Sequence, residues 1–263
     1  ELPRMSPAHG GPALRARGLR KTFGDNVAVD SIDLEIPRGV IYGVVGPNGA
    51  GKTTTIEMAV GLLRPDDGEV SVAGVDSWQD PLEMKTRLGL LADGLPVFDR
   101  LTGAEYLGFL GALRGMDKDT IDRRAQELLG VLGLSEAAGR RIVDYSAGMT
   151  KKILLAGSLI HNPEVLILDE PLEAVDPVSG RQIQQILREY AAAGGTVVIS
   201  SHVMEIVEGL CSHVAIIVDG RVHAAGTVEE VAAGRSLADV FVEAVGGEIA
   251  SGSLSWLGRG DDE

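Results

Sequence analysis

The segment GPNGAGKT, residues 46–53, combines three glycines with a lysine and a threonine. It matches the pattern G-x-x-x-x-G-K-[ST], and it lies between a predicted strand, VIYGVV, and a predicted helix, TTTIEMAVGLL. Glycines let successive backbone N–H groups curl around phosphate oxygens, and a helix N-terminus adds partial positive charge. A purely structural glycine turn is the alternative. The lysine, the threonine and the flanking elements together favour a site for a nucleoside triphosphate.

Two side chains of this segment have specific chemistry. Lys52 can reach the β and γ phosphates of a nucleotide, and the Thr53 hydroxyl can ligate Mg²⁺. We predict nucleotide contacts from the whole run of Gly46, Pro47, Asn48, Gly49, Ala50, Gly51, Lys52, Thr53 and Thr54.

A second apolar run ends in two adjacent carboxylates, in the order Leu-Ile-Leu-Asp-Glu over residues 166–170. Neighbouring residues of a strand point to opposite sides, so the two acids can have different roles. We predict that Asp169 holds Mg²⁺, directly or through water, and that Glu170 polarises the attacking water as a general base. Acids after a strand often cap the next helix instead, but the phosphate loop earlier in the chain strengthens the catalytic interpretation.

The elements that must position these residues begin with strands. Residues 13–45 are predicted to form strands and turns, residues 53–63 have the apolar spacing of a helix, and residues 69–74 return to strand alternation. The opening third is therefore predicted to run strand, loop, helix, strand.

A predicted helical block follows from about residue 101 to 161. Its first helix opens on a capping box, Thr102 with Glu105 three residues on. The apolar faces of the second and third helices consist of Ile121, Ala125, Leu128 and Leu132, and of Met149, Ile153, Ala156 and Ile160. The third helix is apolar nearly all round, which predicts that most of it is buried.

From residue 164 short apolar strands alternate with helices. The strands are EVLILD, TVVIS and HVAIIV, and helices are predicted from about 178 to 192, from about 203 to 211 and near 236 to 245. Apolar strands without alternation, linked by helices, are typical of a parallel sheet covered on both faces.

Composition limits the possible partners. Lys and Arg number 24 against 38 Asp and Glu, so the net charge is −14 and a nucleic-acid duplex would be repelled at long range. The single cysteine, Cys211, excludes an internal disulfide framework, fits a reducing cytoplasm and is expected to be a small buried residue. No apolar run approaches the roughly 18 residues that span a bilayer, and the first residues lack a signal-peptide core. Membrane spans would therefore have to come from another chain.

In this order the motifs resemble the nucleotide-binding subunit of an ATP-binding cassette (ABC) transporter, and the resemblance covers residues 14–246. It implies an α/β fold of the P-loop NTPase (RecA-like) type, with a mostly parallel sheet covered by helices. It also implies an N-terminal antiparallel β subdomain and an inserted α-helical subdomain over about 95–162. Residues 1–13 and 247–263 would be terminal tails.

The resemblance assigns roles to residues outside the two motifs. Phe23, in KTFG, would stack on the adenine ring, although an aromatic residue at a strand end can also be a core residue. Asp176 would be the family's D-loop aspartate, which also contacts nucleotide. His202 would be its switch histidine, close to the γ-phosphate and to Glu170.

Residues 144–149, DYSAGM, correspond to the family's signature loop. In the family two subunits meet head to tail, so Ser146 and Gly148 would close over ATP bound by the phosphate loop of a second ATP-binding subunit. That subunit could be identical or different. Met149 departs from the family's LSGGQ pattern because it replaces a polar glutamine, which leaves the Ser146 hydroxyl and the Gly148 N–H to bind the anion.

Asp93, in LGLLAD, is a larger departure, since the family usually has a glutamine after this strand. Either Asp93 meets the metal directly, which we prefer, or it faces solvent. The segment from Asp93 to Thr102 has an apolar centre of Leu95, Val97 and Phe98. It is either a surface turn anchored by core residues or, with the helical block, the groove that grips a helix of a membrane subunit.

The resemblance implies binding and hydrolysis of ATP that drive transport across a membrane, with ATP and Mg²⁺ as cofactors. Lys52, Glu170 and His202 would be the catalytic residues. Separate transmembrane permease subunits would be the partners, with the chain peripheral on the cytoplasmic side of the cell membrane. Similarity to bacterial ABC-2 type exporters favours export over import, but the transported molecule cannot be read from this chain.

Two alternatives remain open. Asp93 and Met149 are unusual enough to suggest a catalytically weak or silent regulatory subunit. The other alternative is an ABC ATPase that acts on nucleic acid or in translation instead of in transport. The second cassette or long coiled-coil insertion of such proteins is not seen in this sequence, and its strongly acidic charge disfavours nucleic acid.

Overall fold

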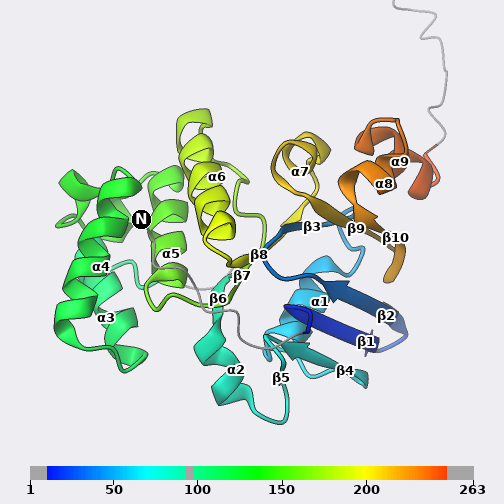
Figure 1. The fold of residues 1–263 in the computed structure, drawn as a ribbon, viewed down its shortest axis with the longest axis horizontal. Coiled ribbons are helices and arrows are strands. Elements are labelled where there is room, and N and C mark those ends of the chain that lie inside the picture. Colours follow the sequence, from blue (N-terminus) through cyan, green and yellow to red (C-terminus); the bar gives the residue numbers. More distant parts are fainter. Residues whose placement is uncertain (1–10, 93–96, 248–263) are drawn as a thin grey trace, which may run out of the picture.

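The computed structural model describes residues 11–92 and 97–247, and its largest element is a sheet of order β10-β9-β3-β8-β7-β6 (Figure 1). Its strands are β3 (Ile41–Val45), β6 (Leu88–Leu91), β7 (Val165–Leu168), β8 (Thr196–Ser201), β9 (His213–Val218) and β10 (Arg221–Thr227). Neighbouring strands from β6 to β9 are parallel, whereas β10 is antiparallel to β9. β3, β7 and β8 are buried along their whole length, as expected for central strands of a covered parallel sheet.

A second, antiparallel sheet has the order β2-β1-β4-β5. Its strands are β1 (Leu14–Phe23), β2 (Asn26–Ile36), β4 (Asp67–Val72) and β5 (Val75–Asp76). The predicted N-terminal β subdomain is confirmed.

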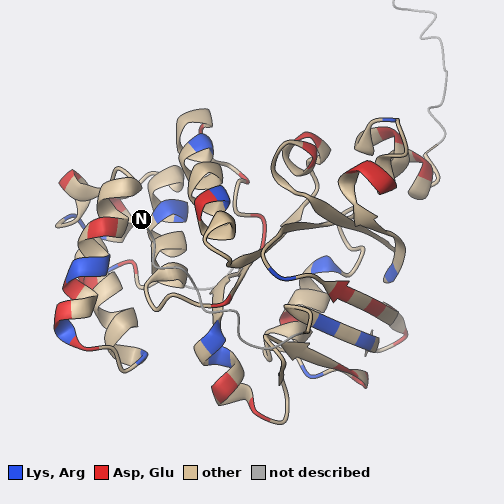
Figure 2. Cartoon of the chain, viewed as in Figure 1, with Lys and Arg blue, Asp and Glu red and all other residues tan. Residues whose placement is uncertain are grey.

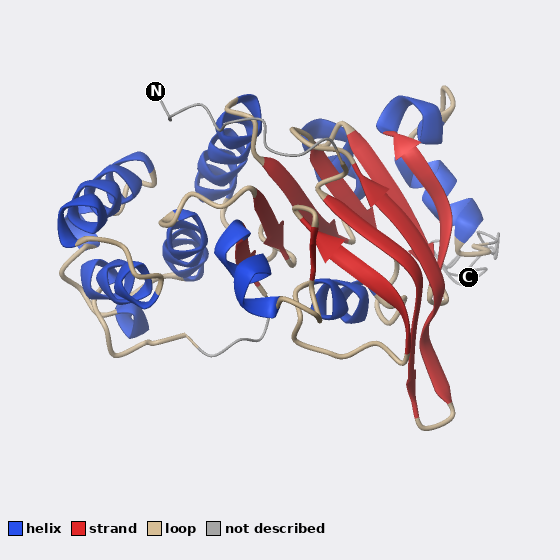
Figure 3. Cartoon of the chain, turned by 60° about the horizontal axis from the view of Figure 1, so that its bottom comes forward, coloured by secondary structure: helices blue, strands red, loops and turns tan. Residues whose placement is uncertain are grey.

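The helices lie on both faces of the strands (Figure 3). They are α1 (Lys52–Ala59), α2 (Pro81–Arg87), α3 (Gly103–Leu113), α4 (Lys118–Val131), α5 (Ala147–Leu159), α6 (Pro177–Ala192), α7 (Met204–Leu210), α8 (Val228–Ala232) and α9 (Leu237–Ala244). The short helices α2 and α8 were not predicted. None of the helices within the described ranges combines the length and the apolar character that a bilayer crossing requires.

Alternate residues of the main sheet face two different cores. Ile199 of β8 belongs to a cluster that includes residues of α5, α6 and α7. Val198, its neighbour, packs on the other face with α1 and the antiparallel sheet. The sheet is therefore covered on both faces as predicted, but one cover is partly a second sheet.

The helical block α3, α4 and α5 gathers at one end of the molecule (Figure 1). The capping box of α3 is confirmed, because the Thr102 hydroxyl accepts from the Glu105 N–H and the Glu105 carboxylate accepts from the Thr102 N–H. Ala147 is the only fully exposed residue of α5, which confirms the predicted burial of that helix.

The basic residues of β1 are paired with acids, and Figure 2 shows the basic bands of β1 beside the acidic bands of the neighbouring strand β2. Arg15 contacts Glu35 at 2.7 Å, and Lys21 contacts Asp66 at 2.8 Å. Cys211, directly after α7, is buried, and burial raises the pKa of its thiol to about 12. It is the inert small residue that the sequence predicts.

His161, just beyond α5, is held against β6. Its Nε2 lies 3.0 Å from the carbonyl oxygen of Leu88, which can only accept, so Nε2 carries the proton. The buried Nδ1 finds no hydrogen-bond partner within the described part of the chain. Burial and, secondarily, the charge of Arg114 lower the pKa of His161 to about 4. The ring is therefore neutral in the folded protein at pH 7.

This pKa predicts acid lability. Because it lies below the ordinary value of 6.5, the unfolded chain takes up the proton first as the pH falls, and the free energy of unfolding should decrease between about pH 6.5 and about pH 4. The variant His161→Gln keeps a donor for the Leu88 carbonyl but cannot titrate. Its free energy of unfolding, measured by denaturant melts at a series of pH values, should therefore fall less steeply with decreasing pH than that of the wild type.

His223→Gln on the exposed side of β10 is the matched control and should leave the wild-type slope in place. If the free energy of unfolding depended on pH equally in wild type and His161→Gln, the lowered pKa of His161 would be contradicted.

Candidate functional site

The predicted site residues meet at the carboxyl ends of three parallel strands. β3 runs into the glycine loop, β7 ends just before Asp169, and β8 ends just before His202. Val45 is paired with Ser201, and Leu168 with Ile199, so these three ends are aligned at one edge of the sheet. Ligands in open parallel sheets bind at this edge.

The glycines of the loop are required by close backbone approach. A Cβ at position 46 would lie 2.2 Å from the carbonyl oxygen of Ile217, and a Cβ at position 51 would lie 2.4 Å from that of Ala28. Gly51 also has a φ of 97°, which favours glycine. The loop thus leaves Asn48 and Gly49 exposed in front of the N-terminus of α1. This is the arrangement that suits a phosphate group.

Lys52 is enclosed by its own loop. Its side chain is buried, and Nζ donates to the carbonyl oxygens of Gly46 at 2.8 Å and Pro47 at 3.1 Å. Burial lowers the pKa of the ammonium, while the charges of Glu170 and Asp169 oppose that shift. A phosphate seated in the loop would therefore lie beside this cation.

Asp169, only 2% exposed, joins the loop to the neighbouring strand. Its Oδ2 accepts from the hydroxyl of Thr53 at 3.1 Å, and its Oδ1 accepts from the hydroxyl of Ser200. Two of the three predicted metal ligands, Thr53 and Asp169, are thus brought together.

One hydroxyl and one carboxylate are hard oxygen donors of the kind that Mg²⁺ prefers. The described residues contain no cluster of three or more His, Cys, Asp and Glu that could hold a metal by themselves. Asp93, the third predicted ligand, lies outside the described residues, so its contact with the metal stays a prediction.

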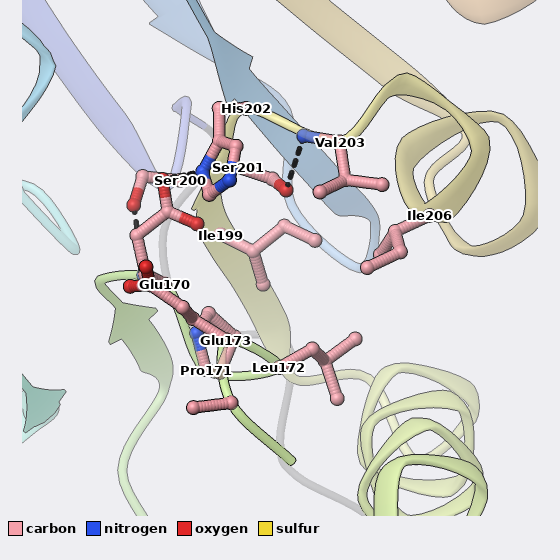
Figure 4. A pocket seen from close by; sticks show the side chains of 11 residues that line it. Glu170, Pro171, Leu172, Glu173, Ile199, Ser200, Ser201, His202, Val203 and Ile206 are labelled. Atoms are coloured by element: carbon pink, nitrogen blue, oxygen red, sulfur yellow. Dashed lines mark hydrogen bonds and ion pairs between the residues drawn. The ribbon is translucent and has the colours of Figure 1, made fainter. Parts of the chain in front are cut away.

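Glu170 and His202 both line a cavity of about 190 Å³ (Figure 4). His202 Nδ1 lies 3.0 Å from Glu170 Oε1. Glu170 has a φ of 46°, a left-handed conformation that is uncommon for a residue with a side chain. Its N–H donates to the Ser200 hydroxyl at 2.9 Å, and its carbonyl accepts from Lys151 at 3.1 Å. The carboxylate is therefore held at the edge of the sheet on a strained, well-anchored backbone.

The signature and D-loop residues form a second group. Ser146 caps α5 by accepting from the Met149 N–H at 3.3 Å. A Cβ on Gly148 would lie 2.8 Å from Oδ2 of Asp176, whose Oδ1 caps α6. The N–H of Ser179 keeps the pKa of Asp176 below its usual range. No hydrogen bond or ion pair in the described ranges joins this group to the phosphate loop.

Phe23 ends β1 and is 50% exposed, with Lys21 Nζ 5.8 Å from its ring centroid. The core alternative for this residue is wrong, while adenine stacking stays a prediction. In the segment after residue 96, Val97 packs partly against the core, whereas Phe98 is 52% exposed and meets Phe109 edge to face at 5.1 Å. Leu95 lies outside the described residues.

Ser200 is the site residue that sequence reasoning missed. Its signal was a pair of serines at the end of an otherwise apolar strand, directly before His202. The close approach of Asp176 to Gly148 was also not predicted from the sequence, because it depends on how α5 and α6 pack.

Residues 29–173, more than half of the chain, match the family model described as ABC transporter. The chain is 38% identical over 219 residues to the daunorubicin/doxorubicin resistance ATP-binding protein DrrA of Streptomyces peucetius, covering 83% of this chain and 66% of that protein. It is 36% identical over 240 residues to the Nod factor export ATP-binding protein I of Cupriavidus metallidurans, covering 90% of this chain and 78% of that protein. A solved structure described as the ATP binding subunit of an ABC transporter superimposes with a TM-score of 0.82 at 25% identity, covering 88% of this chain and 99% of that one.

The packing of the loop predicts a sharp difference between two glycines. Gly46→Ala places a methyl group against the Ile217 carbonyl, so the free energy of unfolding should fall by about 1–3 kcal/mol. Gly108→Ala, in α3, meets nothing within 4 Å and should be neutral or stabilising by up to about 1 kcal/mol. Chemical denaturation of both variants measures this, and equal stabilities would contradict the loop geometry.

Proposed function

This chain belongs to the ABC transporter family, and on that premise we propose that it binds ATP with Mg²⁺ and hydrolyses it to ADP and phosphate. The observation that carries the proposal is the contact of Thr53 with Asp169 beside the pair Glu170 and His202, all at the carboxyl edge of one parallel sheet. A phosphate loop, a metal carboxylate and a general base are the parts that phosphoryl transfer to water needs.

Nucleotide binding rests on the loop from Gly46 to Thr54. Its exposed backbone amides and the N-terminus of α1 would receive the phosphates, and Lys52 would exchange the carbonyls of its own loop for β and γ phosphate oxygens. Phe23, exposed at the end of β1, offers a ring face to the adenine. Thr53 and Asp169 would hold Mg²⁺, which would supply positive charge to neutralise the phosphate oxygens.

Hydrolysis follows from the position of Glu170. Its carboxylate would accept a proton from the water that attacks the γ-phosphorus, while ADP leaves from the opposite side. His202, which contacts Glu170 at 3.0 Å, would fix that carboxylate and reach toward the γ-phosphate. Lys52 would stabilise the charge that develops on the transferred group.

A second ATP-binding subunit would complete the site. Ser146 and Gly148 lie at the N-terminus of α5 beside Asp176, and among the described residues no hydrogen bond or ion pair joins them to the phosphate loop of their own chain. That N-terminus is suited to an anion supplied by another subunit, identical or different. ATP held in this way would stabilise the closed dimer, and hydrolysis would loosen it.

The proposed partners are transmembrane permease subunits, which would hold the chain on the cytoplasmic side of the cell membrane. Phe98 and Phe109 form an exposed aromatic pair beside the helical block, which suits contact with a helix of such a subunit. Export is favoured because a similar protein is named for Nod factor export and another for drug resistance. The cargo would be selected by the permease.

A silent regulatory subunit is the second candidate, suggested by Met149 and Asp93. The contacts of Asp169, Glu170 and His202 favour an active enzyme instead. A role with nucleic acid is disfavoured by the net charge of −14.

Glu170→Gln tests the enzyme directly. Since an amide cannot accept the proton, ATP hydrolysis by the assembled transporter should fall at least about 100-fold while ATP affinity is retained. Glu229→Gln, at an exposed position of α8 away from the residues that line this cavity, makes the same chemical change and should keep wild-type turnover. Wild-type protein that is inactive with its membrane partner would support the silent-subunit alternative.

Ser146→Arg tests the shared site. The bulky cation should block closure over the second subunit's nucleotide and so abolish dimer-dependent hydrolysis. ATP binding by the monomer should change less than about twofold, because the phosphate loop of the same chain is untouched. Gln126→Arg on the exposed side of α4 is the charge-matched control. Loss of monomer binding in Ser146→Arg would count against a site in trans.

A further inference from the structure

Ser200 carries a hydroxyl at a position that solvent does not reach. It has no exposed surface, and it follows Val197, Val198 and Ile199 on the central strand β8. We propose that Ser200 is a positioning residue that orients the metal carboxylate Asp169 and the general base Glu170 through a single hydroxyl. The inference rests on the proposed function of the same site and adds a residue to it.

The first contact fixes the carboxylate of Asp169. The Ser200 hydroxyl donates to Oδ1, and the Thr53 hydroxyl donates to Oδ2 from the other side. A hydroxyl has one proton to give, so the donation from Ser200 is committed to Asp169. With its rotation blocked at both oxygens, the carboxylate presents Oδ2 toward Thr53, where the cation would bind. Partners of this kind behind a metal ligand are known to tune metal affinity.

The second contact fixes the backbone of Glu170. Its φ of 46° is held only if the surrounding structure enforces it, because the left-handed conformation is unfavourable for a residue with a Cβ. The N–H of Glu170 donates to the Ser200 oxygen at 2.9 Å, which uses the acceptor side of the same hydroxyl. Ser200 therefore ties the direction of the Glu170 side chain to the orientation of Asp169.

The adjacent serine provides a matched control. Ser201 is also buried on β8, but its hydroxyl accepts from the Val203 N–H at 3.1 Å, and within the described part of the chain it has no hydrogen bond to Asp169 or Glu170. The variants Ser200→Ala and Ser201→Ala remove the same atom from neighbouring positions of one strand, so a difference between them reports the contacts and not the loss of a buried hydroxyl.

The test measures the affinity of a fluorescent, non-hydrolysable ATP analogue with Mg²⁺ and with chelator. In Ser200→Ala the gain in affinity that Mg²⁺ provides should fall by about tenfold, while the metal-free affinity stays within about twofold of wild type. Ser201→Ala should keep the wild-type gain. The paramagnetic resonance spectrum of Mn²⁺ bound with the analogue should differ from wild type in Ser200→Ala alone.

The possible results distinguish failure of the proposed function from failure of the positioning role of Ser200. Wild-type protein that binds no analogue, or binds it without a gain from Mg²⁺, would overturn the proposed function itself. A wild-type gain that Ser200→Ala retains would overturn the positioning role alone. Equal loss of metal-free and Mg²⁺-dependent affinity in Ser200→Ala would also overturn it, since the hydroxyl would then support the loop as a whole.

Discussion

The parallel alignment of β3, β8 and β7 places residues that are more than 100 positions apart in the chain at one edge of a sheet. β3 delivers the phosphate loop, β7 delivers Asp169 and Glu170, and β8, between them, delivers Ser200 and His202. The register of these strands decides whether Thr53 can reach Asp169 and whether Glu170 can reach His202. The strands are held in this register by the two cores that pack on the faces of the sheet, one helical and one partly formed by a second sheet.

The second constraint is the separation of the two anion-binding groups within one chain. The N-terminus of α1 belongs to the phosphate loop, whereas that of α5 opens beside Asp176 at the end of the helical block. Gly148 has no room for a side chain because Asp176 and Ser179 lie against it, so α5 and the start of α6 are closely packed there. In the proposed dimer each subunit would contribute half of one nucleotide site and half of another, so its association would depend on ATP.

Local patterns were sufficient for the parts that depend on consecutive residues. The phosphate loop, the acids after β7 and the capping box of α3 were predicted because each is set by neighbours in the chain. Features that depend on distant packing were not. The two contacts of Ser200 need the register between β7 and β8, and the approach of Asp176 to Gly148 depends on how α5 and α6 pack. The short helix α2 buries only Met84 and α8 buries no residue, so neither has an apolar face that a sequence pattern could reveal.

Hydrogen–deuterium exchange of the wild-type chain, with and without Mg²⁺ and a non-hydrolysable ATP analogue, tests the account most directly. Amides of residues 46–54 and of the segment after β7 should exchange more slowly when nucleotide is bound, because they lie at the edge of the sheet that receives the phosphates. Residues 146–149 should be protected only at protein concentrations at which the chain associates with a second subunit. Unchanged exchange over residues 46–54 at saturating nucleotide would contradict the account.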